Sequence, residues 1–315
     1  ETIINLKLLI LVMSLFEKCK ENIIDGRRVY VCSKATGYLE TYNQRIVQIC
    51  STKRIAKFFP ALWFSLERYS NKELPSVSPA YVLSDEIYRG IAKIHLVPNK
   101  IQNFKTFETY IIHELTHLWH AQQSGWVKTR AHSHMRLFRA TQKILFEEFQ
   151  GASLPTIRRM LFLFVWSLYV EGIALFNQRL NEEEIEFTDS FFLSNYKDSR
   201  ECARKITKSF LELSQNPKNK ELPYDFQNEQ IRKKIIDRLK LDYYIIAVHM
   251  VFSLLYLDPN LNITKIAKMN HFTFVKKYEA CMLKLNYKPA VSLTSGAGDF
   301  DYKRSLQQWW NAVKR

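Results

Sequence analysis

The chain has 315 residues, of which 46 are Lys or Arg and 31 are Asp or Glu, so its formal net charge is +15. Hydrophobic residues make up 47% and aromatic residues 14%, whereas Gly and Pro supply only 8 and 9 positions. This composition excludes a disordered chain, which lacks so many aromatic residues, and a collagen-like or low-complexity chain. A chain of this length can bury a large core, as one domain or as two packed lobes.

The excess of positive charge predicts attraction to nucleic acid, anionic lipid or acidic protein surfaces. The basic residues are nevertheless scattered, and the densest runs, at 232–234 and 158–159, are short. No sequence signature of a nucleic-acid-binding fold is present. We therefore expect a solvated basic surface, which would suit an acidic partner surface, and no nucleic-acid motif.

The five cysteines are widely spaced and include no Cys-x-x-Cys pair. This pattern predicts separate thiols rather than a disulfide framework, and weakly favours a reducing compartment. The sequence leaves the location open between the cytoplasm and a secreted or translocated protein.

In the first third of the chain, hydrophobic patterning predicts short strands and two helices. A β-like run at Arg28–Ser33 precedes a helical pattern from about Thr41 to Arg68. Strands are expected at Tyr81–Leu83 and Ile91–Val97, and a helix from about Phe104 to Gln123.

Beyond residue 150 nearly every segment has helical periodicity. Helices are expected at Pro155–Leu180, Ser190–Ser214, Glu229–Leu257 and Phe272–Leu285. The predicted fold class is therefore α+β and predominantly helical. A sheet-bearing N-terminal lobe (1–150) carries a small mixed sheet, and a helical lobe (151–315) completes what we expect to be one domain overall.

Two stretches of the chain are apolar enough to be compared with membrane segments. Residues 3–16 are too few to span a bilayer, and we expect an amphipathic helix there rather than the remnant of a signal sequence. Residues 160–176 include Glu171, which needs a partner rather than lipid, so a buried helix is expected. No transmembrane span is predicted.

The most informative motif is His-Glu-x-x-His, formed by His113, Glu114 and His117. On a helix, His113 and His117 project from one face a turn apart, so both imidazoles can reach a single Zn²⁺ at about 2.0–2.1 Å. Glu114 lies roughly 100° round the helix and is not a ligand. Zn²⁺ would lower the pKa of a bound water toward about 7, and Glu114 would accept its proton as general base.

The surroundings of the motif favour this interpretation over a solvated helix with aligned histidines. The apolar residues Ile111, Ile112, Leu115 and Leu118 give the helix a separate packing side. The strand expected at Ile91–Val97 closely precedes the helix, and a strand edge could pair with an extended peptide near the metal.

A catalytic zinc needs a third ligand, and the sequence offers competing candidates. His120 lies on the same helix another turn along, where it cannot easily reach the same ion. His132 and His134 follow His117 by 15 and 17 residues and could act from a nearby loop. Glu171 is favoured, because a carboxylate within a very apolar helix is costly to bury and a Zn²⁺ charge offsets that cost. An ion pair with a core Arg is the alternative for Glu171.

His113-Glu114-Leu-Thr-His117, followed by Glu171-Gly172-Ile-Ala174, resembles the gluzincin branch of zinc metallopeptidases. It is similar to members whose second helix carries Glu-Gly-x-Ala. The resemblance covers about residues 91–176 and implies a thermolysin-like core, with an edge strand, an active-site helix, a glutamate helix and a substrate cleft. It implies His113, His117 and Glu171 as zinc ligands and Glu114 as general base.

Hydrolysis also needs a hydrogen-bond donor for the developing oxyanion. In related gluzincins a Tyr or His of the helical lobe supplies it, and the helix expected around residue 245 is similar to their Tyr-x-x-Gly helix, with Ala247 in the Gly position. On that similarity Tyr244 is the first candidate, followed by Tyr243 and His249. Each could instead be an ordinary core residue.

The sequence therefore predicts a zinc-dependent metalloendopeptidase acting on a protein or peptide substrate. One alternative keeps the zinc but takes the third ligand from His132 or His134, as in proteases that act on nucleic-acid-associated proteins. The other is a non-catalytic basic binding module.

Overall fold

The computed structural model describes residues 18–33, 36–53, 58–67, 79–83, 86–87, 89–101, 103–124, 154–215, 226–294 and 296–314. The chain forms two compact units, residues 1–122 and 123–315. The segment at 3–16, considered above as an amphipathic helix, lies outside the described residues.

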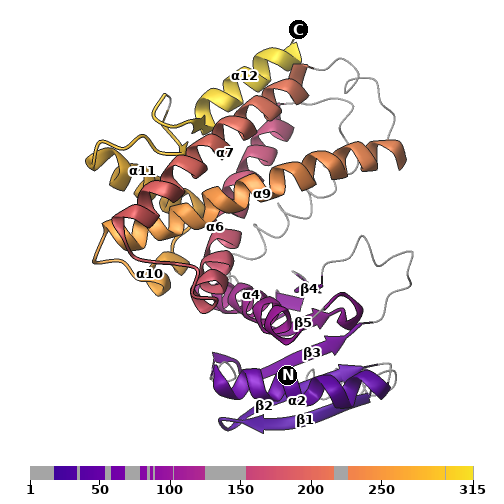
Figure 1. Ribbon diagram of the computed structural model, residues 1–315. Helices are drawn as coiled ribbons and strands as arrows, with labels where there is room; N and C mark the ends of the chain where they lie inside the picture. Colours follow the sequence, from indigo (N-terminus) through magenta and orange to yellow (C-terminus); the bar gives the residue numbers. More distant parts are fainter. Residues whose placement is uncertain are drawn as a thin grey trace. The chain divides into compact units, whose positions relative to one another are not determined.

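The first unit contains a five-stranded mixed sheet. Its strands are β1 (Lys18–Ile24), β2 (Arg27–Ser33), β3 (Ala61–Leu66), β4 (Ala80–Tyr81) and β5 (Lys93–Leu96), in the spatial order β1-β2-β3-β5-β4 (Figure 1). The pairs β2–β3 and β3–β5 are parallel, whereas β1 and β4 are antiparallel to their neighbours. Parallel strands therefore form the centre of the sheet, and an antiparallel strand lies at each end.

The β1–β2 hairpin corrects the expectation of five separate thiols. Asp25 and Gly26 form its turn, with φ values of 50° and 72°, the left-handed conformation that Asp-Gly adopts in tight hairpins. This register places Cys19 directly opposite Cys32, with Cα atoms 4.0 Å apart, and the two form a disulfide. Sequence separation alone concealed the pair, so the cysteine pattern gives no argument for a reducing compartment. Cys50, Cys202 and Cys281 are free.

The helix expected from about Thr41 to Arg68 is wrong in its second half. Helix α2 (Thr36–Thr52) ends before Pro60, and Ala61–Leu66 is strand β3. A central strand flanked by parallel neighbours is buried on both faces, so its sequence reads as a continuous apolar run rather than an alternation. Such a run cannot be told from a buried helix by periodicity alone.

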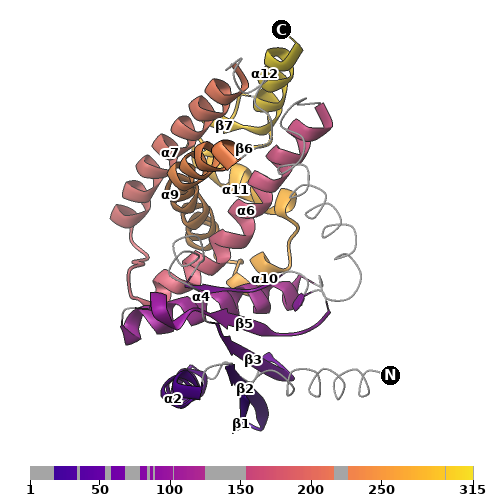
Figure 2. The ribbon, with the colours of Figure 1, turned by 90° about the vertical axis from the view of Figure 1, so that its right-hand side faces the viewer.

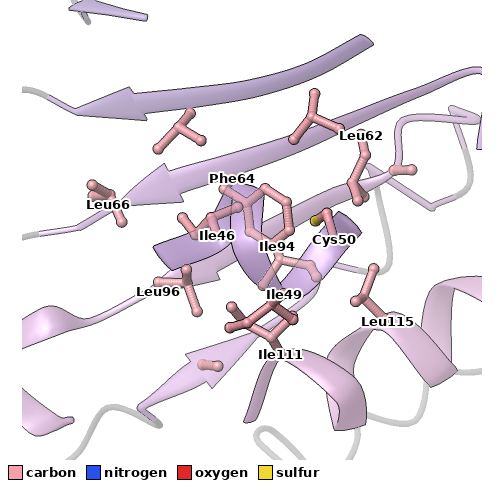
Figure 3. Close-up of a cluster of buried hydrophobic side chains, with 14 of the residues drawn as sticks. Ile46, Ile49, Cys50, Leu62, Phe64, Leu66, Ile94, Leu96, Ile111 and Leu115 are labelled. Carbon is pink, nitrogen blue, oxygen red and sulfur yellow. The ribbon is translucent and has the colours of Figure 1, made fainter. Parts of the chain in front are cut away.

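One face of the sheet forms the core with two helices, α2 and α4 (Phe104–Gln123). Figure 3 shows side chains from both helices meeting those of β3 and β5 in this core. The central members are fully buried: Ile46, Phe64, Ile94 and Ile111. Because α4 packs on this face through every third or fourth residue, its rotation about its own axis is fixed.

The strand expected at Ile91–Val97 is present as β5, but it is not the edge of the sheet. Strand β4 pairs with it, placing Ala80 opposite Leu96 and Tyr81 opposite His95. The strand expected at Tyr81–Leu83 thus occurs at Ala80–Tyr81 and takes the edge position. Peptide pairing at this end would therefore involve β4 rather than β5.

The second unit is helical apart from one small sheet. Its helices are α6 (Leu154–Asn181), α7 (Asp189–Gln215), α9 (Phe226–Leu257), α10 (Ile263–Ala267), α11 (His271–Lys284) and α12 (Tyr302–Lys314). The short parallel strands β6 (Val291–Ser292) and β7 (Phe300–Asp301) pair after α11. Helix α9 packs against both α6 and α7, as Figure 1 shows, and α12 lies next to α7 and α6 (Figure 2).

Two features fix the position of α6 within this unit. A Cβ atom added to Gly172 would lie 2.7 Å from the backbone oxygen of Ala247, so α6 and α9 approach closely only because residue 172 is Gly. The buried hydroxyl of Tyr169 donates to the carbonyl oxygens of Ile266, Ala267 and Met269 at 3.0, 3.0 and 2.7 Å. These contacts attach the α10 segment to α6.

The protein is thus mixed α/β and mostly helical, as the α+β prediction states. Within the described part of the chain, no helix is both long and apolar enough to cross a membrane.

Candidate metal centre

Helix α4 begins with a side-chain cap that sets its start. The Asn103 side-chain oxygen accepts hydrogen bonds from the backbone N–H and the hydroxyl of Thr106, both at 2.9 Å. Phe107, Ile111 and Leu115 then face the core of the first unit. This rotation leaves His113 and His117 on a different, half-buried side of the helix.

The two imidazoles of the motif lie close together, with their Nε2 atoms 3.0 Å apart. Their rings meet edge to face, with centroids 4.7 Å apart. Two nitrogens bound to one tetrahedral zinc at about 2.0–2.1 Å are about 3.3 Å from each other. The pair therefore already has nearly the spacing that a shared ion requires.

The two other polar residues of the motif region are buried. Glu114 is only 8% exposed, so its carboxylate is withdrawn from bulk solvent. His120 is buried, and its burial, with a smaller contribution from His117, lowers the pKa of His120 to about 3. His120 is accordingly a neutral core residue, consistent with its exclusion as a third ligand from the same helix.

Glu171 lies on α6 among buried neighbours. Tyr169, Ile173 and Ala174 are all buried, whereas Glu171 is half-buried. Gly172, the next residue, lies so close to the Ala247 backbone that a Cβ atom there would be 2.7 Å from the Ala247 oxygen. The crossing of α6 and α9 thus fixes the backbone immediately beside Glu171.

The candidate oxyanion donors occupy different surroundings on α9. Tyr243 and Tyr244 are half-buried and precede the Gly172–Ala247 crossing by about one turn. Burial, together with the negative charge of Glu171, raises the pKa of Tyr243, and the two tyrosines share a side-chain hydrogen bond. Tyr243 therefore lies near Glu171 and keeps its phenolic proton.

His249 is completely buried among aromatic rings, including those of Phe192 and Tyr278, and Ser253 is its hydrogen-bond partner. Burial lowers the pKa of His249 to about 3, so this imidazole is neutral. Its surroundings are those of a packing residue, and the placement of the three candidates favours the tyrosines.

Among the described residues, one group of three His, Cys, Asp or Glu side chains could hold a metal ion. It consists of His113, His117 and Glu171, each half-buried, with ligand atoms within 4.8 Å of one another. Two imidazole nitrogens and one carboxylate oxygen form a donor set that zinc accepts. The competing ligands His132 and His134 lie outside the described residues.

Sequence reasoning missed two features of the first unit. The first is the edge position of β4, since a two-residue strand carries almost no pattern. The second is a pair of carboxylates, Glu67 and Glu86, that flank the imidazole of His95 at 2.9 and 2.8 Å. Their distance from His95 along the chain left no motif to find.

Comparison of the chain with family models, with curated proteins and with solved structures gives no match.

Proposed function

We propose that this protein is a zinc-dependent metalloendopeptidase of the gluzincin type with a thermolysin-like core. The observation that carries the proposal is the group formed by His113, His117 and Glu171, with Glu114 next to the first ligand in the sequence. The Nε2 atoms of the two histidines and one carboxylate oxygen of Glu171 would hold the ion. When bound, zinc supplies a Lewis acid that polarises a peptide carbonyl and makes a water more acidic.

Glu114 is the proton carrier in this proposal. Its buried carboxylate would accept a proton from the attacking water and deliver it to the nitrogen of the leaving amine. Burial suits this role, because it keeps bulk solvent away from the site of proton transfer.

Tyr244 or Tyr243 would donate a hydrogen bond to the oxygen on which negative charge develops. The raised pKa of Tyr243 keeps its hydroxyl protonated at neutral pH, which a donor requires. Tyr244 remains the first candidate by its similarity to the Tyr-x-x-Gly position, and Tyr243 is the alternative that lies near Glu171.

The substrate backbone would pair with β4. This strand ends the sheet, with β5 on one side and no further strand among the described residues on the other. An extended peptide can add to such an edge through main-chain hydrogen bonds, which are independent of side-chain sequence. The pairing would hold a peptide bond still while the alternate side chains determine specificity.

The proposal is tested by incubating the full chain with a library of quenched peptides, with and without a chelator. We expect cleavage that the chelator abolishes and stoichiometric Zn²⁺ restores. The basic binding module predicts instead no cleavage under any condition, together with salt-sensitive binding to polyanions such as heparin.

A further inference from the structure

The face of the sheet that points away from α2 and α4 carries a row of residues unlike the apolar core. In the strand registers, Cys32 is opposite Ser65, Ser65 is opposite His95, and His95 is opposite Tyr81. The first three are almost completely buried. Cys32 is held by its disulfide to Cys19, whereas Ser65 and His95 are buried polar residues whose hydrogen bonds must be satisfied within the protein.

His95 lies at the centre of this row, between two carboxylates. Its Nδ1 atom is 2.9 Å from Glu67 Oε1, and its Nε2 atom is 2.8 Å from Glu86 Oε2. A neutral imidazole has one N–H and one lone pair, so it can donate to only one of two ionised carboxylates. Both contacts are hydrogen bonds to ionised carboxylates only when His95 is an imidazolium.

The neighbouring charges match that protonation state. Lys93 Nζ is 3.6 Å from Glu86 Oε1, and the Ser65 hydroxyl donates to Glu67 at 3.0 Å. Two carboxylates thus face two cations, Lys93 and His95, and the charges cancel within the group. With the phenol of Tyr81 beside the ring, these are the charged and titratable groups that face His95 in the described part of the chain.

The same ring links three segments of the sheet. Glu67 directly follows β3, Glu86 lies in the connection from β4 to β5, and the Tyr81 ring of β4 stacks on His95 with a centroid distance of 4.9 Å and an interplanar angle of 3°. Tyr81 is one of only two residues in β4, so this contact involves half of the edge strand.

We propose that His95 is a positioning residue whose imidazolium form fixes the edge strand β4 and the β4–β5 connection to the sheet. This attachment also sets the register at which an extended substrate pairs with the protein, an extension that rests on the proposed function. The geometry that carries the proposal is the double carboxylate contact together with the stacked Tyr81.

The attachment must depend on pH. Burial and, to a smaller extent, the charge of Lys93 lower the pKa of His95, but the hydrogen bonds to Glu67 and Glu86 and the charge of Glu86 outweigh them and raise the pKa above 6.5. In the closed form β4 and the β4–β5 connection are attached to the sheet, and in the open form they are released. A group whose pKa is raised in the closed form stabilises that form fully below the open-form pKa of about 6.5. This stabilisation is lost as the pH rises through the pKa of the closed form. The hydrogen bond from His95, opposed by burial, lowers the pKa of Glu67, so its contribution is lost in acid.

The test uses NMR on the full chain at a series of pH values. The protonation of both His95 ring nitrogens is read from their chemical shifts. The attachment is read from the hydrogen-exchange protection of Val97, which donates to Pro79 O at 2.8 Å, and of Ile91, which donates to Glu86 O at 2.8 Å. Amides of the β2–β3 ladder serve as the internal reference.

We expect both ring nitrogens to carry protons at about pH 6 and the ring to lose one proton only above about pH 6.5. Above about pH 6.5, protection of Val97 and Ile91 should fall about tenfold per pH unit until the pKa of His95 in the attached form is passed, while reference amides keep theirs. A ring that is already neutral at about pH 6, or protection that follows the reference amides, overturns the proposal.

Glu86→Gln is the matched variant. A carboxamide can accept a hydrogen bond from an imidazole or donate one to it, so it tolerates a neutral His95. The pH-dependent fall in protection should then be absent or strongly reduced. Glu67→Gln provides the same test from the other side of the ring, and protection that still falls as in the wild type in both variants contradicts the proposal.

The link to substrate is tested by peptide hydrolysis. Raising the pH through the pKa of His95 should increase KM at least tenfold more in the wild type than in Glu86→Gln, with kcat changing alike in both. Absence of all peptide cleavage refutes the proposed function, and the NMR experiment alone then decides whether protonated His95 attaches β4 to the sheet. Cleavage with a KM that has the same pH dependence in both proteins contradicts the positioning role alone.

Discussion

The first unit places histidines in two opposite electrostatic settings. On α4, the Nε2 atoms of His113 and His117 lie 3.0 Å apart. On β5, both nitrogens of His95 contact carboxylates, at 2.9 and 2.8 Å. In the proposed zinc site the α4 pair would offer lone pairs to a cation, which requires neutral rings, whereas His95 is itself the cation in the proposed attachment of β4. The partners of an imidazole, rather than the residue type, therefore determine whether it is a candidate metal ligand.

The largest effect expected from this comparison is loss of the metal. His117→Ala or Glu171→Gln should abolish zinc binding and peptidase activity, since removing groups that only support metal ligands already costs about 10–100-fold in affinity. Elemental analysis of the purified variants measures this. His95→Gln is the matched histidine control and should retain zinc, and Glu184→Gln is the control for an exposed glutamate.

The same analysis separates the two candidate ligand sets. If the third ligand is His132 or His134, the double substitution of these two residues removes the metal while Glu171→Ala retains it. We expect the reverse result.

The next largest effect comes from comparing two carboxylates of the first unit. Glu114 is proposed to transfer a proton, whereas Glu86 is proposed to hold His95. Glu114→Gln should lower kcat by about 10²–10⁴-fold while leaving zinc content unchanged, because only proton transfer is lost. Glu86→Gln should keep kcat and alter the pH dependence of KM. Steady-state kinetics with zinc quantification distinguishes them, and full activity without the Glu114 carboxylate would refute the proposed mechanism.

A smaller effect is expected from the backbone that carries Glu171. Gly172→Ala places a methyl group 2.7 Å from the Ala247 carbonyl oxygen, so α6 and α9 must separate. We expect the free energy of unfolding to fall by about 2–3 kcal/mol, the upper part of the range for overpacking, measured by urea denaturation. Gly26→Ala meets no atom within 4 Å but has a φ of +72°, and its cost should be only about 1 kcal/mol. Equal costs would contradict the helix-crossing explanation.

The smallest effect is a pH dependence opposite in sign to that of His95. Burial lowers the pKa of His249 to about 3, so the unfolded chain binds a proton below about pH 6.5 that the folded chain does not. Stability should decrease as the pH falls, by at most about 1.4 kcal/mol per pH unit from this residue. His249→Phe should reduce the slope of unfolding free energy between pH 6.5 and 5. An unchanged slope would show that His249 is not buried in its neutral form.

The helical part of the fold could be predicted from the sequence because its hydrophobic periodicity persists over long segments. The predicted helix Phe104–Gln123 coincides with α4, and the helix expected at Pro155–Leu180 corresponds to α6, Leu154–Asn181. The strand β3 was missed because six buried apolar residues carry no alternation. The disulfide between Cys19 and Cys32 depends on a hairpin register that was not predicted.

The residues of the candidate sites also differ in how far the sequence alone predicts them. The residues His113 and His117 could be named from sequence, because helical spacing alone puts both on one face. The prediction of Glu171 as third ligand depends on a family resemblance and on the energetic cost of burying a charge. The contacts of His95 with Glu67 and Glu86, 28 and 9 residues earlier in the chain, follow no recognisable motif, and only tertiary structure shows them.

The most direct test of the zinc proposal is titration of the metal-free full chain with Zn²⁺ in a calorimeter, alongside His117→Ala. We predict one site per chain in the wild type and none in the variant, with protons released as the ligands bind. Saturable binding of equal affinity in both proteins, or none in the wild type, would contradict the proposal that His113, His117 and Glu171 hold a catalytic zinc.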